Sequence, residues 1–392
     1  MSSSTQPAQP ASARTLRVVA IGGGTGLSTL LRGLKRYVPA PAGSRRATDP
    51  SRRRAHSPAD SRPDPRTDPK IDAAFAAHPC LIRDLAAIVT VTDDGGSSGR
   101  LREDLKMLPP GDVRNCMVAL SEDEHLLARL FQYRFAQGDL DGHSFGNLFV
   151  AALSSITGDF AQAVQVSSQI LATRGRIYPA TNSDVTLAAQ MEDGSTVRGE
   201  TAITASPHRI VELRLEPAGA EPLSGALDAI AHADLITLGP GSLYTSLITN
   251  LLVRGIPEAI AASSAVRVYI GNLMTQANES LGLSHSQHIE KILQHCGANS
   301  AKNKTAPLPK LFDYALINTA PISPTLLAQY AREGQTPIEV DFDRIRALGV
   351  EPIPGNFAHE GDVLRHDHDR VSEALLQLAL AKDPLASAAA HA

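Results

Sequence analysis

The feature that most constrains this chain is an apolar run that ends in a cluster of glycines and leads into a helical pattern. Residues 18–21 read Val-Val-Ala-Ile, residues 22–26 read Gly-Gly-Gly-Thr-Gly, and four leucines then recur at helical spacing between residues 27 and 34. Glycines let backbone N–H groups approach an anion, and the start of a helix favours negative charge. The pattern therefore predicts a strand, a phosphate-binding turn and a helix.

Strand and helix patterns alternate along most of the remaining chain. Apolar runs predict strands at residues 16–21, 85–91, 234–238, 266–270 and 314–317, and helical spacing predicts helices at residues 27–37, 223–232, 285–296 and 370–380. Between residues 175 and 217 the period changes towards two, which indicates antiparallel strands. We therefore predict an α/β protein with a three-layer α/β/α Rossmann-like fold, a mostly parallel sheet and an antiparallel β subregion.

Two segments differ in composition from the rest. Residues 1–14 are rich in Ser, Ala, Pro and Gln, and residues 41–79 hold eight Lys/Arg, five Asp and seven Pro with few aliphatic side chains. Such segments bury too little apolar surface to offset the entropy cost of ordering them. We predict a disordered tail over residues 1–14 and a disordered insert over residues 41–79, within a single nucleotide-binding domain that spans residues 15–385.

Charge and cysteine content exclude several classes of protein. A net charge of −4 does not favour nucleic acid or an anionic membrane, and no run approaches the ~20 apolar residues of a membrane helix. Cys80, Cys116 and Cys296 lie far apart and form no CxxC pair. We expect a cytoplasmic protein whose partner is a small molecule, and the sequence leaves a homo-oligomer open.

Two more glycine loops follow predicted strands, at Asp93–Arg100 and Gly239–Ser242. Because ligands bind at the carboxyl ends of strands in an open parallel sheet, we expect these loops and Gly22–Gly26 to converge on one cleft. The first loop lacks the Lys-Ser/Thr ending of an ATP-hydrolysing P-loop, and Leu27 or Thr29 stands where the dinucleotide fingerprint has its third glycine. The sequence therefore favours a phosphate-bearing ligand, but it matches neither an ATP-hydrolysing P-loop nor a dinucleotide site.

Several polar residues beside these loops have both a functional and a structural interpretation. Asp93 and Asp94 suit a Mg²⁺ or substrate-hydroxyl site, and they suit helix capping equally. Arg100 and Arg114 suit a phosphate clamp, although surface ion pairs with nearby acids are the alternative. His143 and Asn147 share one helix face, and they suit either contacts with a polar ligand or a helix cap.

Six motifs in order make the sequence resemble the YvcK-like gluconeogenesis factor family, which is related to the 2-phospho-lactate transferase (CofD) of coenzyme F420 synthesis. The motifs are GGGTGL at residues 22–27, TDDGGSSGRLR at 92–102, LPPGDVRN at 108–115, GHSFGN at 142–147, LGPGSLYTS at 238–246 and NLMTQ at 272–276. The resemblance covers residues 16–380 apart from the insert.

This resemblance implies a Rossmann-like cytoplasmic protein that binds UDP-sugars such as UDP-N-acetylglucosamine and is needed for growth and cell shape on gluconeogenic carbon. The transferase relatives move a phospholactyl-type group from a nucleotide diphosphate with Mg²⁺, so a regulator and a transferase both stay open. The family pattern also places an aromatic residue after Gly282, where this chain has Leu283.

The candidate site residues combine the loops and the resemblance. We predict ligand contacts from Gly23, Gly24, Thr25, Gly26, Gly95, Ser97, Ser98, Arg100, Arg114, Asn115, His143, Asn147, Gly239, Gly241, Ser242, Thr245, Asn272 and Thr275. Asp93 and Asp94 are the predicted metal ligands, and they are catalytic residues only if the protein is a transferase.

Overall fold

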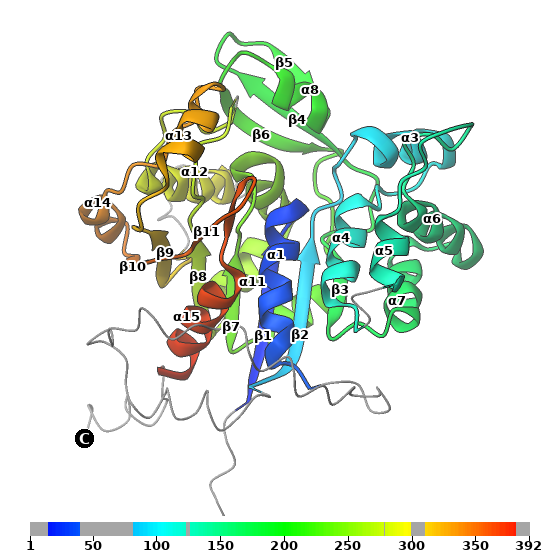
Figure 1. The fold of residues 1–392 in the computed structure, drawn as a ribbon, viewed down its shortest axis with the longest axis horizontal. Helices are drawn as coiled ribbons and strands as arrows, with labels where there is room; N and C mark the ends of the chain where they lie inside the picture. The colour runs from blue at the N-terminus through cyan, green and yellow to red at the C-terminus, as the bar shows by residue number, and fades with distance from the viewer. Residues whose placement is uncertain (1–14, 40–80, 123–125, 278, 299–309, 382–392) are drawn as a thin grey trace, which may run out of the picture.

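A seven-stranded sheet, parallel throughout, forms the centre of the computed structural model (Figure 1). The structure describes residues 15–39, 81–122, 126–277, 279–298 and 310–381, so the predicted tail and insert lie outside the described residues. The strand order is β10-β9-β8-β7-β1-β2-β3. The strands are β1 (Leu16–Gly22), β2 (Ile82–Val89), β3 (Arg176–Pro179), β7 (Leu235–Leu238), β8 (Val266–Ile270), β9 (Tyr314–Asn318) and β10 (Glu351–Gly355).

The two faces of the sheet carry separate apolar cores, which makes the predicted three layers. On one face, Val18 and Ala20 of β1 pack towards a first group of helices. These are α1 (Gly24–Leu34), α4 (Gly111–Leu120), α5 (Leu126–Gln132), α6 (Phe145–Thr157), α7 (Phe160–Ile170) and α15 (His368–Ala381). Helices α15, α1 and α4 lie side by side on this face (Figure 1).

The opposite face of β1 presents Val19 and Ile21 to the second core. The helices there are α9 (Ser224–Ala231), η3 (Leu243–Ile248, a π-helix), α10 (Thr249–Leu251), α11 (Ile256–Ala262), α12 (His285–Ala298) and α14 (Phe342–Ala347). Alternate side chains of one strand point to opposite faces, so a continuous apolar run can serve both cores. Across the described ranges, no helix combines the length and apolar character needed to cross a bilayer.

The predicted antiparallel subregion is present as a separate three-stranded sheet of order β5-β4-β6. Its strands are β4 (Thr186–Met191), β5 (Thr196–Arg198) and β6 (Ile210–Glu216), and α8 (Glu200–Ala205) packs beside them. Only part of the predicted subregion is antiparallel, because β3 pairs in parallel with β2 at the edge of the main sheet. The prediction also missed the short hairpin of β11 (Ala358–Glu360) and β12 (Leu364–His366).

The remaining elements are α3 (Gly96–Leu105), the 3-10 turn η1 (Lys35–Tyr37) and α13 (Pro324–Ala331). The chain enters the sheet at β1, extends to β2 and β3 on one side, and later returns to place β7 on the other side of β1. The strand order therefore reverses between β1 and β7. Open α/β sheets bind ligands at this switch point, outside the carboxyl ends of the strands.

Candidate functional site

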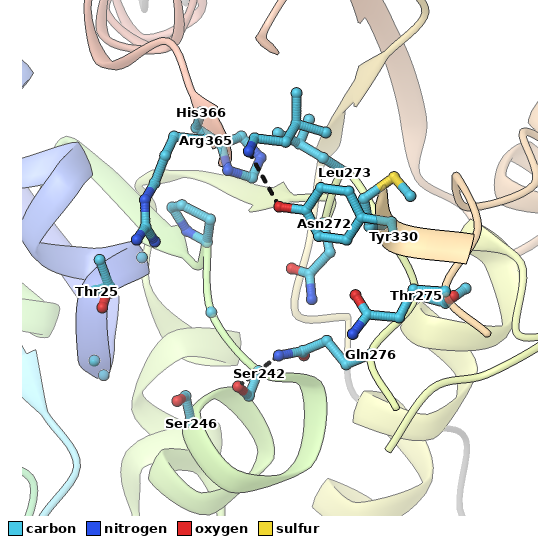
Figure 2. Close-up of a pocket in the computed structure, with 18 residues that line it drawn as sticks. Thr25, Ser242, Ser246, Asn272, Leu273, Thr275, Gln276, Tyr330, Arg365 and His366 are labelled. Atoms are coloured by element: carbon cyan, nitrogen blue, oxygen red, sulfur yellow. Dashed lines mark hydrogen bonds between the residues drawn. The ribbon is translucent and has the colours of Figure 1, made fainter. Parts of the chain in front are cut away.

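A pocket of about 340 Å³ opens at the switch point between β1 and β7 (Figure 2). The ends of the two strands are level, because Ile21 of β1 pairs with Leu238 of β7. The loops after β1, β7 and β8 all contribute to the wall. The lining residues are Gly23, Gly24, Thr25, Gly26, Pro240, Gly241, Ser242, Ser246, Asn272, Leu273, Met274, Thr275, Gln276, Tyr330, Gln335, Leu364, Arg365 and His366.

The first wall is the glycine turn that starts α1. Gly23 has no side chain to cap this helix, and the Asp112 carboxyl accepts the N–H of Gly24, so the later N–H groups of the first turn are the ones that need partners from outside the helix. Gly24 has a φ of +59°, a conformation that side chains other than glycine rarely adopt. A Cβ atom on Gly26 would lie 2.3 Å from the carbonyl oxygen of Pro240. The absence of side chains thus lets the turn after β1 pack directly against the loop after β7.

The second wall follows β7 and continues into the π-helix η3. The Gln276 Nε2 donates to Ser242 Oγ at 3.0 Å, and the two side chains meet in the pocket (Figure 2). The side chain of Asn250 donates to the carbonyl oxygens of Gly22 and Ser246, at 2.9 and 2.7 Å. Isolated π-helical turns are frequent at functional sites. The π-helix brings Ser246 to the pocket. The side chain of Asn250, in the following helix α10, joins the backbone of the π-helix to the end of β1.

The third wall carries polar atoms that lack partners. The amide oxygens of Asn272 and Gln276 are buried and accept no hydrogen bond from the described residues. Such orphaned acceptors cost free energy unless a donor reaches them. Tyr330 lies beside them, and its hydroxyl accepts from the backbone N–H of Leu364 at 3.1 Å. This wall offers acceptors for ligand N–H groups and an aromatic ring for a flat group.

The β11–β12 hairpin supplies the positive charge of the pocket. Arg365 extends across the opening towards Thr25 (Figure 2). No ion pair or hydrogen bond engages its guanidinium within the described residues. His366 beside it donates from Nε2 to the carbonyl oxygen of Gly271 at 3.0 Å, and burial lowers its pKa to about 4. The cation facing the glycine turn at neutral pH is therefore Arg365.

An acidic compartment, formed by the carboxyl groups of Asp93, Asp112 and Glu200, adjoins the glycine turn. A Cβ atom on Gly23 would lie 2.8 Å from Asp112 Oδ2 and 3.3 Å from Ser246 Oγ, so Gly23 separates the acids from the pocket. Burial, and then repulsion from Asp93, raises the pKa of Asp112 to about 7. Burial, followed by repulsion from Asp112 and Asp93, raises the pKa of Glu200 to about 9. These carboxyl groups are crowded enough to resist ionisation together.

The two predicted metal ligands lie in different environments. Asp94 Oδ1 accepts from the backbone N–H of Thr201 at 2.8 Å and from its hydroxyl at 2.6 Å, so it caps the start of α8. Asp93 accepts from the backbone N–H of Gly95 at 3.0 Å and faces the acidic compartment. Helix capping, the structural interpretation, fits Asp94. Asp93 instead acts on Asp112, whose pKa its charge helps to raise.

The structure divides the predicted ligand residues into two groups. Those that line the pocket are Gly23, Gly24, Thr25, Gly26, Gly241, Ser242, Asn272 and Thr275. Those outside its lining are Gly95, Ser97, Ser98, Arg100, Arg114, Asn115, His143, Asn147, Gly239 and Thr245. The loops after β1 and β7 therefore converge as expected, but the loop after β2 serves the acidic compartment instead.

Most of the outlying residues have structural partners. The Ser97 hydroxyl contacts His143 Nδ1 and accepts from Asn147 Nδ2, both at 3.1 Å, which joins α3 to α6. Arg100 donates to the carbonyl oxygen of Asp141 at 2.6 Å. Thr245 donates to Glu279 Oε1 at 2.9 Å. These side chains position the loops around the site.

Arg114 and Asn115 contact each other outside the pocket lining. Arg114 donates to Asn115 Oδ1 at 2.8 Å, and its Nε is buried without a partner among the described residues. Burial, and then repulsion from Arg134, lowers the pKa of Arg114. Leu283, at the position where the family pattern has an aromatic residue, packs against the second core.

Sequence reasoning missed several lining residues that come from distant segments. Tyr330, Gln335, Arg365 and His366 lie in parts of the chain without a glycine motif. Arg365 and His366 lie in β12, and this strand and its partner β11 have only three residues each, which is too short for a periodic pattern in the sequence. Asp112 belongs to the LPPGDVRN motif, and an acidic residue in the first turn of a helix is the signal that the sequence offers for it.

Comparison with known proteins identifies relatives over most of the chain. The family model described as 2-phospho-L-lactate transferase CofD matches residues 18–358. A gluconeogenesis factor from Halalkalibacterium halodurans is 44% identical over 92% of this chain and 95% of that relative. A gluconeogenesis factor from Bacillus subtilis is 40% identical over 92% of this chain and 98% of that relative.

A solved structure shares the same fold. The crystal structure of a protein member of the UPF0052 family from Bacillus halodurans has a TM-score of 0.76 and 44% identity, covering 93% of this chain and 99% of that one. The resemblance in motifs, the matched family model and the shared fold agree along the same part of the sequence. The chain therefore belongs to the CofD family, among relatives that are named gluconeogenesis factors.

Proposed function

We propose that this protein binds a nucleotide diphosphate sugar of the UDP-N-acetylglucosamine type and acts as a regulator needed for growth and cell shape on gluconeogenic carbon. Relatives named gluconeogenesis factor support the regulatory role. The observation that carries the ligand class is the pocket between β1 and β7, where the glycine-rich start of α1 faces Arg365. Both features favour a ligand with a diphosphate.

The polar wall supports the base and sugar parts of this ligand. A uracil ring and an acetamido group each carry an N–H donor, and the buried amide oxygens of Asn272 and Gln276 lack donors among the described residues. Tyr330 offers a flat apolar surface in the same pocket. Because Leu283 packs into the core, Tyr330 is the aromatic side chain that we assign to base stacking.

Arg365→Gln is expected to weaken the binding of UDP-N-acetylglucosamine by 10-fold or more. A hydrogen bond to a charged group contributes about 1.5–3 kcal/mol, and the substitution removes the charge from the pocket without removing the side-chain stem. Isothermal titration calorimetry on the full chain measures the effect. Arg332→Gln, at the end of α13 and outside the lining, is the matched control and should bind like the wild type.

The outcome separates the proposal from non-specific attraction of the anion. Equal weakening in both variants would point to a long-range charge effect, and the pocket assignment would then be wrong. No measurable heat with wild-type protein at millimolar ligand would overturn the nucleotide-sugar proposal itself.

A transferase dependent on Mg²⁺ is the second candidate, and the acidic compartment favours it. Burial, and then repulsion from Asp93, raises the pKa of Asp112 to about 7, and a divalent cation between two such carboxylates relieves their repulsion. Asp93 and Asp112 would hold the ion, which would neutralise charge on a diphosphate leaving group. Gly23 and Gly24 lie between Asp112 and the pocket, which supports a metal ion next to the diphosphate of the nucleotide.

Asp112→Asn is expected to lower Mg²⁺ affinity at least 10-fold, whereas Asp94→Asn should leave both Mg²⁺ affinity and stability nearly unchanged, because the amide oxygen of asparagine keeps the helix cap. The rise in melting temperature with Mg²⁺ concentration reports both effects. The reverse pattern, with Mg²⁺ affinity lost in Asp94→Asn alone, would move the metal site to Asp94. No Mg²⁺ response in the wild type would eliminate the transferase candidate.

A further inference from the structure

A second cavity, of about 270 Å³, lies at the far end of α1 from the nucleotide pocket. The last turn of α1 and η1 supply Arg32, Lys35 and Arg36, α5 supplies Arg129, and α15 begins there with His368. An 11-residue helix is about 16 Å long, so α1 separates this cavity from the glycine turn. The cavity is therefore distinct from the site described above.

The cations of this cavity differ in how they are paired. Lys35 Nζ donates to the carbonyl oxygen of Ser121 at 3.0 Å, and Arg36 forms an ion pair with Asp369 at 2.5 Å. Arg32 and Arg129 form no ion pair or hydrogen bond with any residue in the described ranges. Two guanidinium groups from separate helices thus line one cavity without a counter-ion from the described protein.

Helix electrostatics alone does not account for this arrangement. Basic side chains near a helix C-terminus offset its partial negative charge, and Arg32 fits that role in α1. Arg129 belongs to another helix, yet it lines the same cavity, so the C-terminus of α1 does not explain its position. Guanidinium groups present several N–H donors in a fixed plane that matches phosphate oxygens. A bound phosphate group would use the donors of both side chains.

We propose that this cavity is a second ligand site, which binds a small phosphorylated metabolite through Arg32 and Arg129. The phosphate lies between the two guanidinium groups, with Arg36 at its edge. The remaining wall is formed by the small side chains of Val118, Ala119 and Ala128 and by the uncharged amide of Gln132, so the ligand body is compact and uncharged. A sugar monophosphate has this shape and charge. The site is independent of nucleotide-sugar binding at the opposite end of α1.

Titration of the full chain with glucose 6-phosphate, with glucose as the uncharged control, tests the proposal. We expect binding of glucose 6-phosphate, at least 10-fold weaker binding by Arg32→Gln/Arg129→Gln, and no binding of glucose. Arg209→Gln/Arg332→Gln is the matched control, because both arginines are exposed and lie outside both cavities. Melting temperatures establish that each variant is folded.

A third variant, Arg365→Gln, distinguishes the two sites, since the nucleotide pocket also offers a cation to a phosphate. Unchanged glucose 6-phosphate affinity in Arg365→Gln supports the second site. Three outcomes overturn it: no wild-type binding at millimolar glucose 6-phosphate, equal weakening in both double variants, or loss of binding in Arg365→Gln with retention in Arg32→Gln/Arg129→Gln. None of these outcomes depends on whether the protein binds a nucleotide sugar.

Discussion

Gly26→Ala is expected to abolish nucleotide-sugar binding and to lower the free energy of unfolding by about 3 kcal/mol. The new Cβ atom would lie 2.3 Å from the carbonyl oxygen of Pro240 and 2.7 Å from its carbonyl carbon. Both atoms belong to backbone, so no flexible side chain can move aside. Alanine is the better helix former by about 1 kcal/mol, which is too little to offset this overlap. The loop after β7 must shift, and the pocket loses its second wall.

Gly22→Ala is the matched control for this substitution. Its Cβ atom would lie 3.4 Å from the Leu27 Cβ and 3.8 Å from the same Pro240 oxygen, which is ordinary contact. We expect near wild-type stability in urea denaturation and near wild-type calorimetric affinity for UDP-N-acetylglucosamine. A Gly26→Ala protein that binds within 10-fold of the wild type would show that the two loops need not touch for the pocket to form.

The sequence predicted the central layers of the fold well, because those elements are governed by local patterns. The run of apolar residues in β1 serves two cores at once, and such continuous runs are recognisable without knowledge of their neighbours. The start of α1 was also accessible, since a glycine turn before regularly spaced leucines has few other uses. The outer elements were harder. β12 has three residues, and so short a strand leaves no periodic signal.

The site could be predicted only where its residues follow a strand directly. Thr25, Ser242 and Asn272 come next to the ends of β1, β7 and β8, so the topology alone places them together. Arg365 reaches the same pocket from a hairpin near the C-terminus, and nothing local in the sequence indicates that approach. For Asp94, glycine-rich surroundings suggested a ligand contact, and the structure adds a hydrogen bond from its carboxylate to the start of a helix in the β-rich subregion, which no local pattern indicates.

The free energy of unfolding is expected to fall by about 2 kcal/mol between pH 7 and pH 8.5, and Glu200→Gln should remove most of that fall. Burial, then repulsion from Asp112 and Asp93, raises the pKa of Glu200 to about 9, whereas its ordinary value is 4.5. In this interval the unfolded chain has lost the proton and the folded protein still holds it. Folding therefore takes up a proton, and stability decreases as pH rises.

Glu279 is a second carboxyl group whose pKa burial raises, and the difference between Glu200→Gln and the wild type isolates the contribution of Glu200. Burial lowers the pKa of His285 to about 4 and that of His288 to about 3, so their effect on stability is confined to pH values below about 6.5. The contribution of Asp112, with a pKa of about 7, is mostly lost by the start of the interval. Buried Cys116 and Cys296 have raised pKa values, which is why the upper limit is set near the ordinary thiol value of about 8.5.

Urea denaturation at the two pH values, in buffer with a chelator so that no divalent cation binds the acids, measures the effect. Glu200→Gln keeps the shape of the side chain and removes its proton equilibrium, so its stability should be nearly constant where the wild type declines. Glu103→Gln, an exposed acid on α3, should decline as the wild type does. If the free energy of unfolding falls with pH equally in Glu200→Gln and the wild type, Glu200 is already ionised at neutral pH. The acidic compartment would then offer a metal ion one more negative charge than the burial of Glu200 implies.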